Sequence, residues 1–215
     1  DVIFNGPADT LTLTANVQPA IMATSIAMMR AAGATVPEYV AGHSLGEYTA
    51  LCAAGALSVG DAAKLLRARG NAMQNAAPAG TGLTAVIMGM EIEALQKICE
   101  TAGCDVANDN SPGQVVISGT RESVETAMEM AKGQGARRAM PLALSVPVHC
   151  RVQAPAADVM RAALDSVEFK KPIVPIILNK TCAPTTDIDE IKDALVYQMT
   201  HGVRWRESVL NMANL

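Results

Sequence analysis

The ten residues "AGHSLGEYTA", Ala41–Ala50, set one serine between two glycines, in the order Gly42-His43-Ser44-Leu45-Gly46. A strand-like segment precedes this G-x-S-x-G pattern and helical character follows it, which is the sequence context of a nucleophile elbow. The glycines are expected to let neighbouring segments come close, and the serine hydroxyl to be exposed at a helix N-terminus, where the amide of Leu45 can face a developing oxyanion. We predict that Ser44 is a nucleophile. The alternative is a chance match in a chain rich in Gly and Ala.

A serine hydroxyl needs a base to take its proton, and the chain has three histidines. His149, in "SVPVHC", follows a predicted strand at the point where the chain returns to a predicted cleft, so we predict that it is the base. His43 is expected to point away from Ser44 and to pack within the turn. His201 is expected to end a helix.

No acidic residue has the position of a triad acid. Serine hydrolases of the nucleophile-elbow type place Asp or Glu between Ser and His along the chain. Asp105 and Asp109 lie in that interval without a suitable strand end, and Asp165 and Asp187 follow the histidine. This argues against a plain esterase.

Residue periodicity predicts an α/β protein with a small unit inserted into a larger one. In the larger unit we expect a helix over Ala20–Ala32 with Pro19 near its first position, strands at 38–43 and 174–180, and helices at 45–57, 61–75, 156–167, 187–199 and 205–215. Ser58 is expected to cap the 61–75 helix. In the smaller unit we expect strands at 83–89, 104–109, 115–119 and 136–144, helices at 91–102 and 121–135, and a turn at 110–114.

The β-α-β-β-α-β order of the middle segment is that of a ferredoxin-like unit. We therefore predict an α/β-hydrolase-like large subdomain formed by 1–78 and 146–215, and a ferredoxin-like small subdomain formed by 79–145. A cleft is expected between them.

Composition narrows the classes of protein. Of 215 residues, 50% are hydrophobic and 18% charged, and the net charge of −4 argues against non-specific nucleic-acid binding. No apolar run approaches the roughly 20 residues that cross a bilayer, and no secretory signal opens the chain. The five cysteines show no C-x-x-C pairing, so we expect neither a disulfide framework nor a zinc site, and reduced thiols in a cytoplasmic protein. We also expect a monomer.

Four motifs in this order, "GHSLGEYTAL", "RARGNAMQ", "NDNSPGQVVISG" and "SVPVHC", resemble the malonyl-CoA:acyl-carrier-protein transacylases, the acyltransferase family of fatty acid and polyketide synthesis. The resemblance covers nearly the whole chain. It implies transfer of a malonyl group from malonyl-CoA to the phosphopantetheine thiol of acyl carrier protein, with no metal or bound cofactor. A serine esterase or thioesterase and a non-catalytic carrier-protein-binding module stay open as alternatives.

The resemblance also implies roles for single residues. Ser44 matches the acylated serine, and His149 matches a base that is held by a main-chain carbonyl. Arg69 matches the arginine that pairs with the malonyl carboxylate, a task that suits a planar, permanently charged fork. Without the resemblance, Arg69 is better explained as a solvated helix residue, like Arg67. Two weaker matches are the pocket-side Gln18 and the cleft-lining Asn110, for which a turn-forming role explains the residue equally well.

Departures from the family leave two points open. The family's first strand with its "GQG" loop, and its C-terminal "GPG" segment, have no counterpart in residues 1–215, so we expect a fragment. The chain does contain a Gly-Gln-Gly sequence at 133–135, but it ends a predicted helix and does not correspond to the family's "GQG" loop. Val148 stands where malonyl-selective members commonly have Ser or Phe, which leaves the choice of acyl group open.

A basic lip is expected to attract an acidic carrier protein. Arg137 and Arg138 are adjacent on a predicted strand, so their side chains should point to opposite faces and only one should line the cleft. Lys132 could extend this lip. A solubilising surface pair explains the two arginines at least as well.

Overall fold

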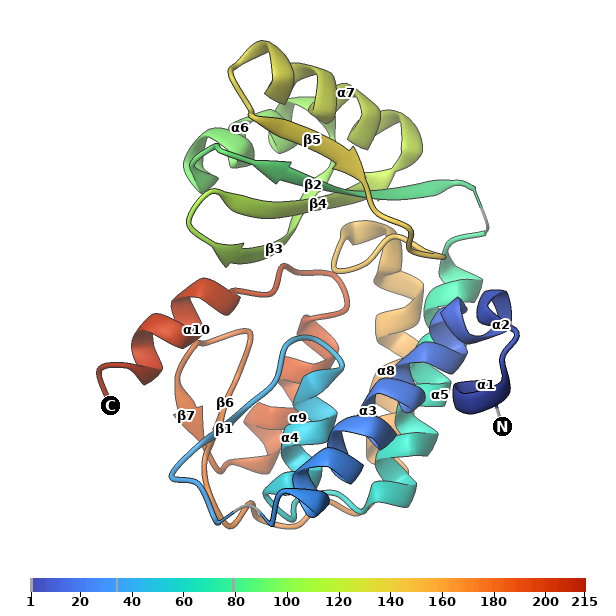
Figure 1. Cartoon of the computed structure of the whole chain (residues 1–215), viewed down its shortest axis with the longest axis vertical. Helices are drawn as coiled ribbons and strands as arrows, with labels where there is room; N and C mark the ends of the chain where they lie inside the picture. The colour runs from blue at the N-terminus through green and yellow to red at the C-terminus, as the bar shows by residue number, and fades with distance from the viewer. Residues whose placement is uncertain (1, 34, 79) are drawn as a thin grey trace.

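A computed structural model describes residues 2–33, 35–78 and 80–215. It is a mixed α/β structure with two separate sheets, one in the upper part of the molecule and one in the lower part (Figure 1). Each part has its own hydrophobic cluster of buried residues. In the described residues, no helix is long and apolar enough to span a membrane.

The upper part is a four-stranded antiparallel sheet with two helices on one face (Figure 1). Its elements follow the chain as β2 (Gly82–Met88), α6 (Ile92–Ala102), β3 (Asp105–Ser111), β4 (Gln114–Thr120), α7 (Arg121–Gly133) and β5 (Arg138–Pro141). The strand order is β3-β4-β2-β5. Alternate residues of β2 and β4, such as Ile87 and Ile117, are fully buried against the helices, as the two-residue period of a strand requires.

The lower part is mainly helical around a small three-stranded sheet, ordered β1-β6-β7 with β1 and β6 parallel. Its elements are α1 (Val2–Asn5), α2 (Ala8–Thr12), α3 (Thr14–Ala31), β1 (Val40–Ala41), α4 (Gly46–Ala53), α5 (Val59–Ala76), the 3-10 turn η1 (Arg151–Gln153), α8 (Ala154–Asp165), β6 (Ile176–Ile177), β7 (Pro184–Thr185), α9 (Ile188–Tyr197) and α10 (Trp205–Met212).

Several expected boundaries are wrong. Helix α3 begins at Thr14, so Pro19 lies inside it rather than at its first position. Proline is common at a helix start because its missing N–H costs nothing there, but packing of α3 along α5 carries the helix through it. The strands expected at 38–43 and 174–180 shrink to two residues each, because only those pairs meet.

Other expectations hold or shift by a few residues. The Ser58 hydroxyl caps α5 by accepting from the Asp61 amide at 3.0 Å. Helix α4 stops at Ala53 and α10 at Met212. The expected boundary between the two units falls at position 79, outside the described residues.

Helices α3 and α5 cross closely because α5 has Gly70 at the contact. A Cβ on Gly70 would lie 2.4 Å from Cα of Ala15, so no larger residue fits without separating the helices. This approach sets the neighbouring Arg69 of α5 against Gln18 of α3.

The two parts are joined by main-chain pairing at the edge of the upper sheet. The Asp109 amide donates to the Val203 carbonyl, and the Val203 amide donates to the Ala107 carbonyl, both at 2.9 Å. A Cβ on Gly202 would lie 2.5 Å from the Val106 carbonyl oxygen. Strand β3 therefore fixes the segment that leads out of α9.

Candidate active site

Ser44 sits on a strained turn between β1 and α4. Its φ is +55°, in the left-handed region that non-glycine residues rarely adopt. A Cβ on Gly42 would lie 2.0 Å from the Gly46 carbonyl, so the turn requires glycine there. Gly46 itself has open space around its missing Cβ, so the expected close approach at the second glycine is wrong. Leu45 occupies the N-cap position of α4.

The turn is held from outside by the buried side chain of Asn179. Its Oδ1 accepts from the Ser44 amide and its Nδ2 donates to the Gly42 carbonyl, each at 2.8 Å. One amide side chain thus bonds the main chain on both sides of His43. Strain of one to three kcal/mol, about the usual cost of such a backbone, is offset by these buried bonds.

His149 lies against the serine. Its Nε2 is 2.7 Å from Ser44 Oγ, and its Nδ1 is 2.5 Å from the main-chain carbonyl oxygen of Gln198. A carbonyl only accepts, so Nδ1 carries the proton and Nε2 presents its lone pair to the serine hydroxyl. Burial, followed by the nearby charge of Arg69, lowers the pKa of His149 to about 3. The imidazole is therefore neutral near pH 7 and is available as a base.

The acidic residues considered from the sequence are engaged elsewhere. Asp105 pairs with Arg151 at 2.7 Å, and Asp109 pairs with Arg206 at 2.9 Å. Asp187 caps α9, and Asp165 pairs with Lys192. Within the described part of the chain, the Nδ1 partner of His149 is a carbonyl rather than a carboxylate.

Arg69 is buried beside the serine, with 2% of its surface exposed. Its Nη1 donates to Gln18 Oε1 at 2.6 Å, and its Nη2 donates to Ser44 Oγ at 3.1 Å and to Gln198 Oε1 at 2.7 Å. The interpretation as a solvated helix residue is wrong, although it holds for the exposed Arg67. Burial lowers the pKa of Arg69, yet a guanidinium keeps its charge in proteins.

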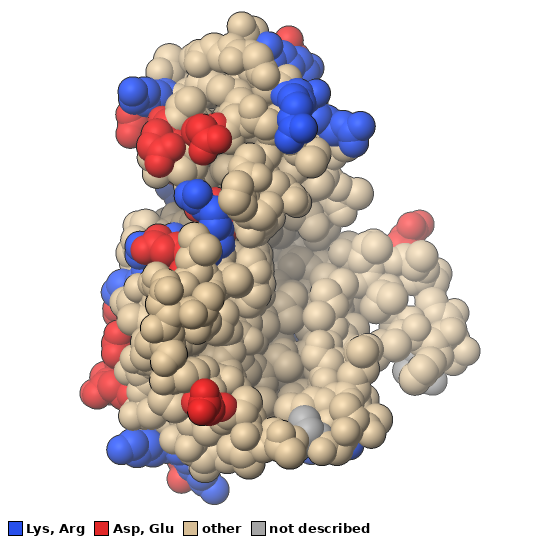
Figure 2. Space-filling model, turned by 60° about the vertical axis from the view of Figure 1, so that its left-hand side comes forward, with Lys and Arg blue, Asp and Glu red and all other residues tan. Residues whose placement is uncertain are grey.

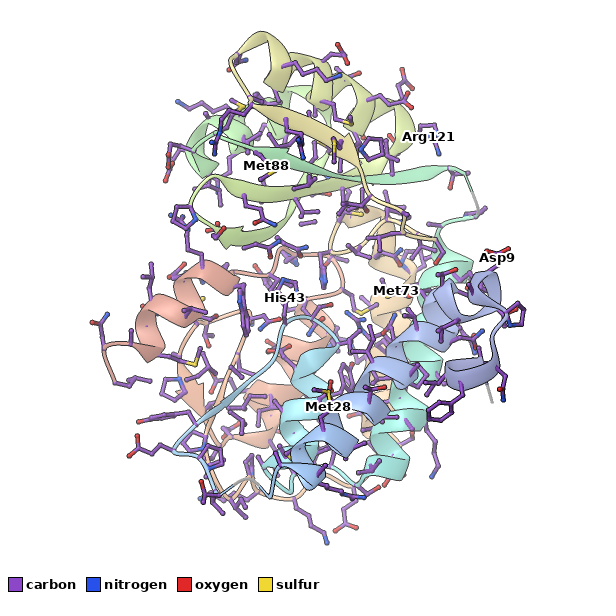
Figure 3. The ribbon with its side chains drawn as sticks, viewed as in Figure 1. Asp9, Met28, His43, Met73, Met88 and Arg121 are labelled. Atoms are coloured by element: carbon purple, nitrogen blue, oxygen red, sulfur yellow. The ribbon has the colours of Figure 1, made fainter. Side chains whose placement is uncertain are left out.

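The other two histidines lie outside this pair. His43 does not pack within the turn: its Nε2 is 2.9 Å from Asn110 Oδ1, and its ring lies 5.6 Å from that of Trp205. It stands between the lower helices and the upper sheet (Figure 3). Asn110 belongs to strand β3, so its expected turn role is wrong. His201 is exposed just past α9 and stacks on Tyr197.

The face in Figure 2 is hollowed between the upper and lower parts, and the visible charged side chains lie mostly on the upper part and along the left-hand edge and bottom of the view, while the hollow is bordered mainly by uncharged residues. Arg137 and Arg138 are both exposed, and that only one of them lines the cleft stays a prediction. Arg137 precedes β5 and its side chain packs over Gly89. Lys132 pairs with Glu129 at 2.7 Å.

Three polar residues at the site were missed from the sequence: Glu47, Asn179 and Gln198. All three are at most 1% exposed. Glu47 interrupts the small and apolar residues after Ser44, which is the one signal that pointed to it. Asn179 and Gln198 lie 135 and 154 positions from the serine, and neither belongs to a local motif.

The class of protein follows from a family match over nearly the whole chain. Residues 1–214 match the family described as the acyl transferase domain, and the chain belongs to that family.

Within it, the chain is similar to proteins named malonyl CoA-acyl carrier protein transacylase. It is 45% identical to the one from Bacillus subtilis, over 97% of this chain and 68% of the relative. It is 44% identical to the one from Escherichia coli K12, over 97% and 70%. The crystal structure of acyl-carrier-protein-S-malonyltransferase from Bartonella henselae has a TM-score of 0.95 and 48% identity, over 100% of this chain and 71% of that one.

A further solved structure is described as a type II PKS acyl-carrier protein in complex with its malonyl-transacylase. It has a TM-score of 0.95 and 40% identity, over 99% of this chain and 71% of that one.

Proposed function

We propose that this acyltransferase moves a malonyl group from malonyl-CoA to the phosphopantetheine thiol of acyl carrier protein, through a malonyl ester of Ser44. The observation that carries the proposal is the convergence on one hydroxyl: Ser44 Oγ lies 2.7 Å from a neutral imidazole and 3.1 Å from a buried guanidinium. The names of the relatives at 44–45% identity support the same activity.

In the first half-reaction, His149 Nε2 takes the proton of the Ser44 hydroxyl as Oγ attacks the thioester carbonyl carbon. The carbonyl oxygen becomes an oxyanion at the start of α4, where the Leu45 amide would donate to it. The C–S bond then breaks, the electron pair stays on sulfur, and the imidazolium returns its proton to the coenzyme A thiolate. A malonyl ester remains on Ser44.

In the second half-reaction, the same steps run with a different thiol. His149 takes the proton of the phosphopantetheine thiol, and sulfur attacks the ester carbon. The ester C–O bond breaks, and the proton returns to Ser44 Oγ. Because each step only moves the acyl group between sulfur and oxygen, and His149 takes up and returns one proton, no further co-reactant is needed.

Arg69 would select acyl groups that end in a carboxylate. Its Nη2 already lies within 3.1 Å of the reacting oxygen, so a carboxylate on the acyl chain could reach the guanidinium while the carbonyl carbon meets Ser44. Gln18 holds Nη1 and thereby the plane of the fork. Asn110 would border the entrance through its bond to His43.

We also propose the finer classification of the fold. The four-stranded order β3-β4-β2-β5, all antiparallel with both helices on one face, supports a ferredoxin-like small subdomain over 79–145. The strand–serine–helix turn supports an α/β-hydrolase-like large subdomain over 1–78 and 146–215. The free thiols of all five cysteines are compatible with a cytoplasmic protein.

Mass spectrometry after incubation with malonyl-CoA tests the function. We expect a malonyl adduct on the peptide that contains Ser44, and its disappearance when a carrier protein with a free phosphopantetheine thiol is added. Release of free malonate without a thiol acceptor would indicate a hydrolase. Absence of any adduct would contradict the proposal and favour a binding module.

A further inference from the structure

A buried carboxylate lies directly behind the site. Glu47, in the first turn of α4, has none of its surface exposed. Its Oε1 accepts from the main-chain amide of Asn179 at 2.8 Å, and its Oε2 accepts from the side-chain amide of Gln198. No step of the proposed mechanism uses this residue, although burying a carboxylate carries a large desolvation cost.

Gln198 connects this carboxylate to every reacting group. Its Nε2 faces Glu47 and the Ser44 carbonyl oxygen, whereas its Oε1 accepts from Arg69 Nη2 at 2.7 Å. Its main-chain carbonyl accepts from His149 Nδ1. An amide has a donor end and an acceptor end, so its orientation decides whether Arg69 meets an oxygen or an NH₂ group.

An ionised carboxylate can only accept hydrogen bonds, and it therefore selects one of the two orientations. We propose that Glu47 is a positioning residue: by accepting from Gln198, it turns the amide oxygen of Gln198 onto Arg69 and steadies the segment whose carbonyl holds His149. This inference rests on the proposed function for the roles of Arg69 and His149. Its consequence for the reactivity of Ser44 can be measured without malonyl-CoA.

Protonation of Glu47 should undo this orientation. Burial raises its pKa to about 7, against the opposing effects of the bonds from Asn179 and Gln198 and of the Arg69 charge. The charged or titratable groups that face it are Arg69 from α5 and Tyr48 from its own helix. Once protonated, Glu47 presents an O–H to the NH₂ of Gln198. The amide then has no single favoured orientation, and in the turned one its NH₂ meets the donors of Arg69.

Labelling of Ser44 by a small fluorophosphonate, followed across pH, tests the proposal. In the wild type we expect the labelling rate to fall about tenfold as the pH drops through about 7. His149, with a pKa of about 3, does not titrate in that range. In Glu47→Gln the rate should be about ten- to a hundredfold lower. It should also lack the pH step, because the introduced amide does not titrate and no longer selects one orientation of Gln198.

Two variants provide the controls. Glu100→Gln removes an exposed carboxylate from α6 and should keep both the rate and the pH step. The double variant Glu47→Gln with Gln198→Glu reverses donor and acceptor. The introduced amide at position 47 then donates to the introduced carboxylate at position 198, whose second oxygen accepts from Arg69. We expect labelling at neutral pH to recover at least several-fold over Glu47→Gln.

A wild-type rate that is flat through about pH 7 would overturn the proposal, even if Glu47→Gln failed to fold. So would a folded Glu47→Gln that labels like the wild type, or a folded double variant no faster than Glu47→Gln. Failure of the proposed function gives a different pattern: no malonyl adduct on wild-type Ser44, while fluorophosphonate labelling retains its dependence on Glu47.

Discussion

The upper sheet and the turn around Ser44 are stabilised in different ways. Strands β2 and β4 are seven residues long and pair along their whole length. Strands β1 and β6 have two residues each, and the turn that follows β1 is held by side chains. Asn179 and Gln198 bond it from positions 135 and 154 residues away. A ladder can be specified by a local pattern, whereas these bonds exist only after the whole lower part has folded.

Replacement of Ser44, the proposed nucleophile, should have the largest effect of any single change at the turn. Ser44→Ala removes the attacking hydroxyl but leaves the main-chain bonds to Asn179. We expect no acyl adduct by mass spectrometry and a melting temperature close to that of the wild type. An adduct that persists in Ser44→Ala would show that another residue is the nucleophile, and the buried Cys150, next to His149, would be the first candidate.

Arg69→Ala should lower the rate of malonyl transfer but not that of acetyl transfer. A malonyl carboxylate brought into a buried site without its partner loses about 3–5 kcal/mol, so we expect transfer of malonyl to fall by a hundredfold or more. Acetyl has no charge to neutralise and should be transferred as well as before, or better. An equal loss for both acyl groups, measured as kcat/KM, would make Arg69 a structural residue.

The contribution of buried hydrogen-bonding side chains to stability should be larger at the turn than in the sheet. Asn179→Ala leaves the Ser44 amide and the Gly42 carbonyl without partners, which should cost about 3 kcal/mol of unfolding free energy. Thr84→Val in β2 loses one hydroxyl bond to Ser118, which keeps others, and should cost about 1 kcal/mol. Denaturant titrations measure both. Equal losses of unfolding free energy in the two variants would contradict the idea that the turn depends more strongly on side-chain hydrogen bonds than the upper sheet does.

The pH dependence of stability should change when Glu47 is replaced. Its folded pKa is raised from 4.5 to about 7, so between these values the folded state holds a proton that the unfolded state has lost, and stability falls as pH rises. His149, lowered from 6.5 to about 3, acts in the opposite direction. The difference in unfolding free energy between Glu47→Gln and the wild type should therefore increase, by up to ~1.4 kcal/mol for each pH unit, as the pH rises between the unfolded and the folded pKa of Glu47. Parallel curves from urea titrations would contradict this.

The smallest effect is expected at the upper sheet's basic edge. Arg137→Glu should slow transfer to carrier protein a few-fold at low salt and leave acylation by malonyl-CoA unchanged, since rim charges act mainly on the association rate. Arg161→Glu, on the exposed side of α8, is the control. A loss that salt does not reduce, or that appears in both half-reactions, would exclude docking at Arg137.

The same contrast explains what the sequence could predict. The strand-like runs at 83–89 and 115–119 and the helical segments that follow them located every element of the upper sheet to within a few residues. The Ser44–His149 pair followed from a motif and from elimination among three histidines. Asn179 and Gln198 could not be found, because a polar residue next to a short strand or a helix end has many uses. Glu47 stood out only as a charge among small and apolar residues, which does not show what it binds. The burial of Arg69 depends on Gly70 and on a helix crossing that no local pattern records.

The pairing of Val203 with β3 has a consequence for aggregation. An uncovered edge strand is a template for pairing with another chain. Here one edge of the upper sheet, β3, is occupied by the main chain of Val203. The opposite edge, β5, is four residues long, begins with a charged residue and ends with Pro141, which has no amide to donate. Both edges therefore disfavour the addition of a foreign strand, and the exposed Met140 of β5 stays a surface residue rather than a seed for association.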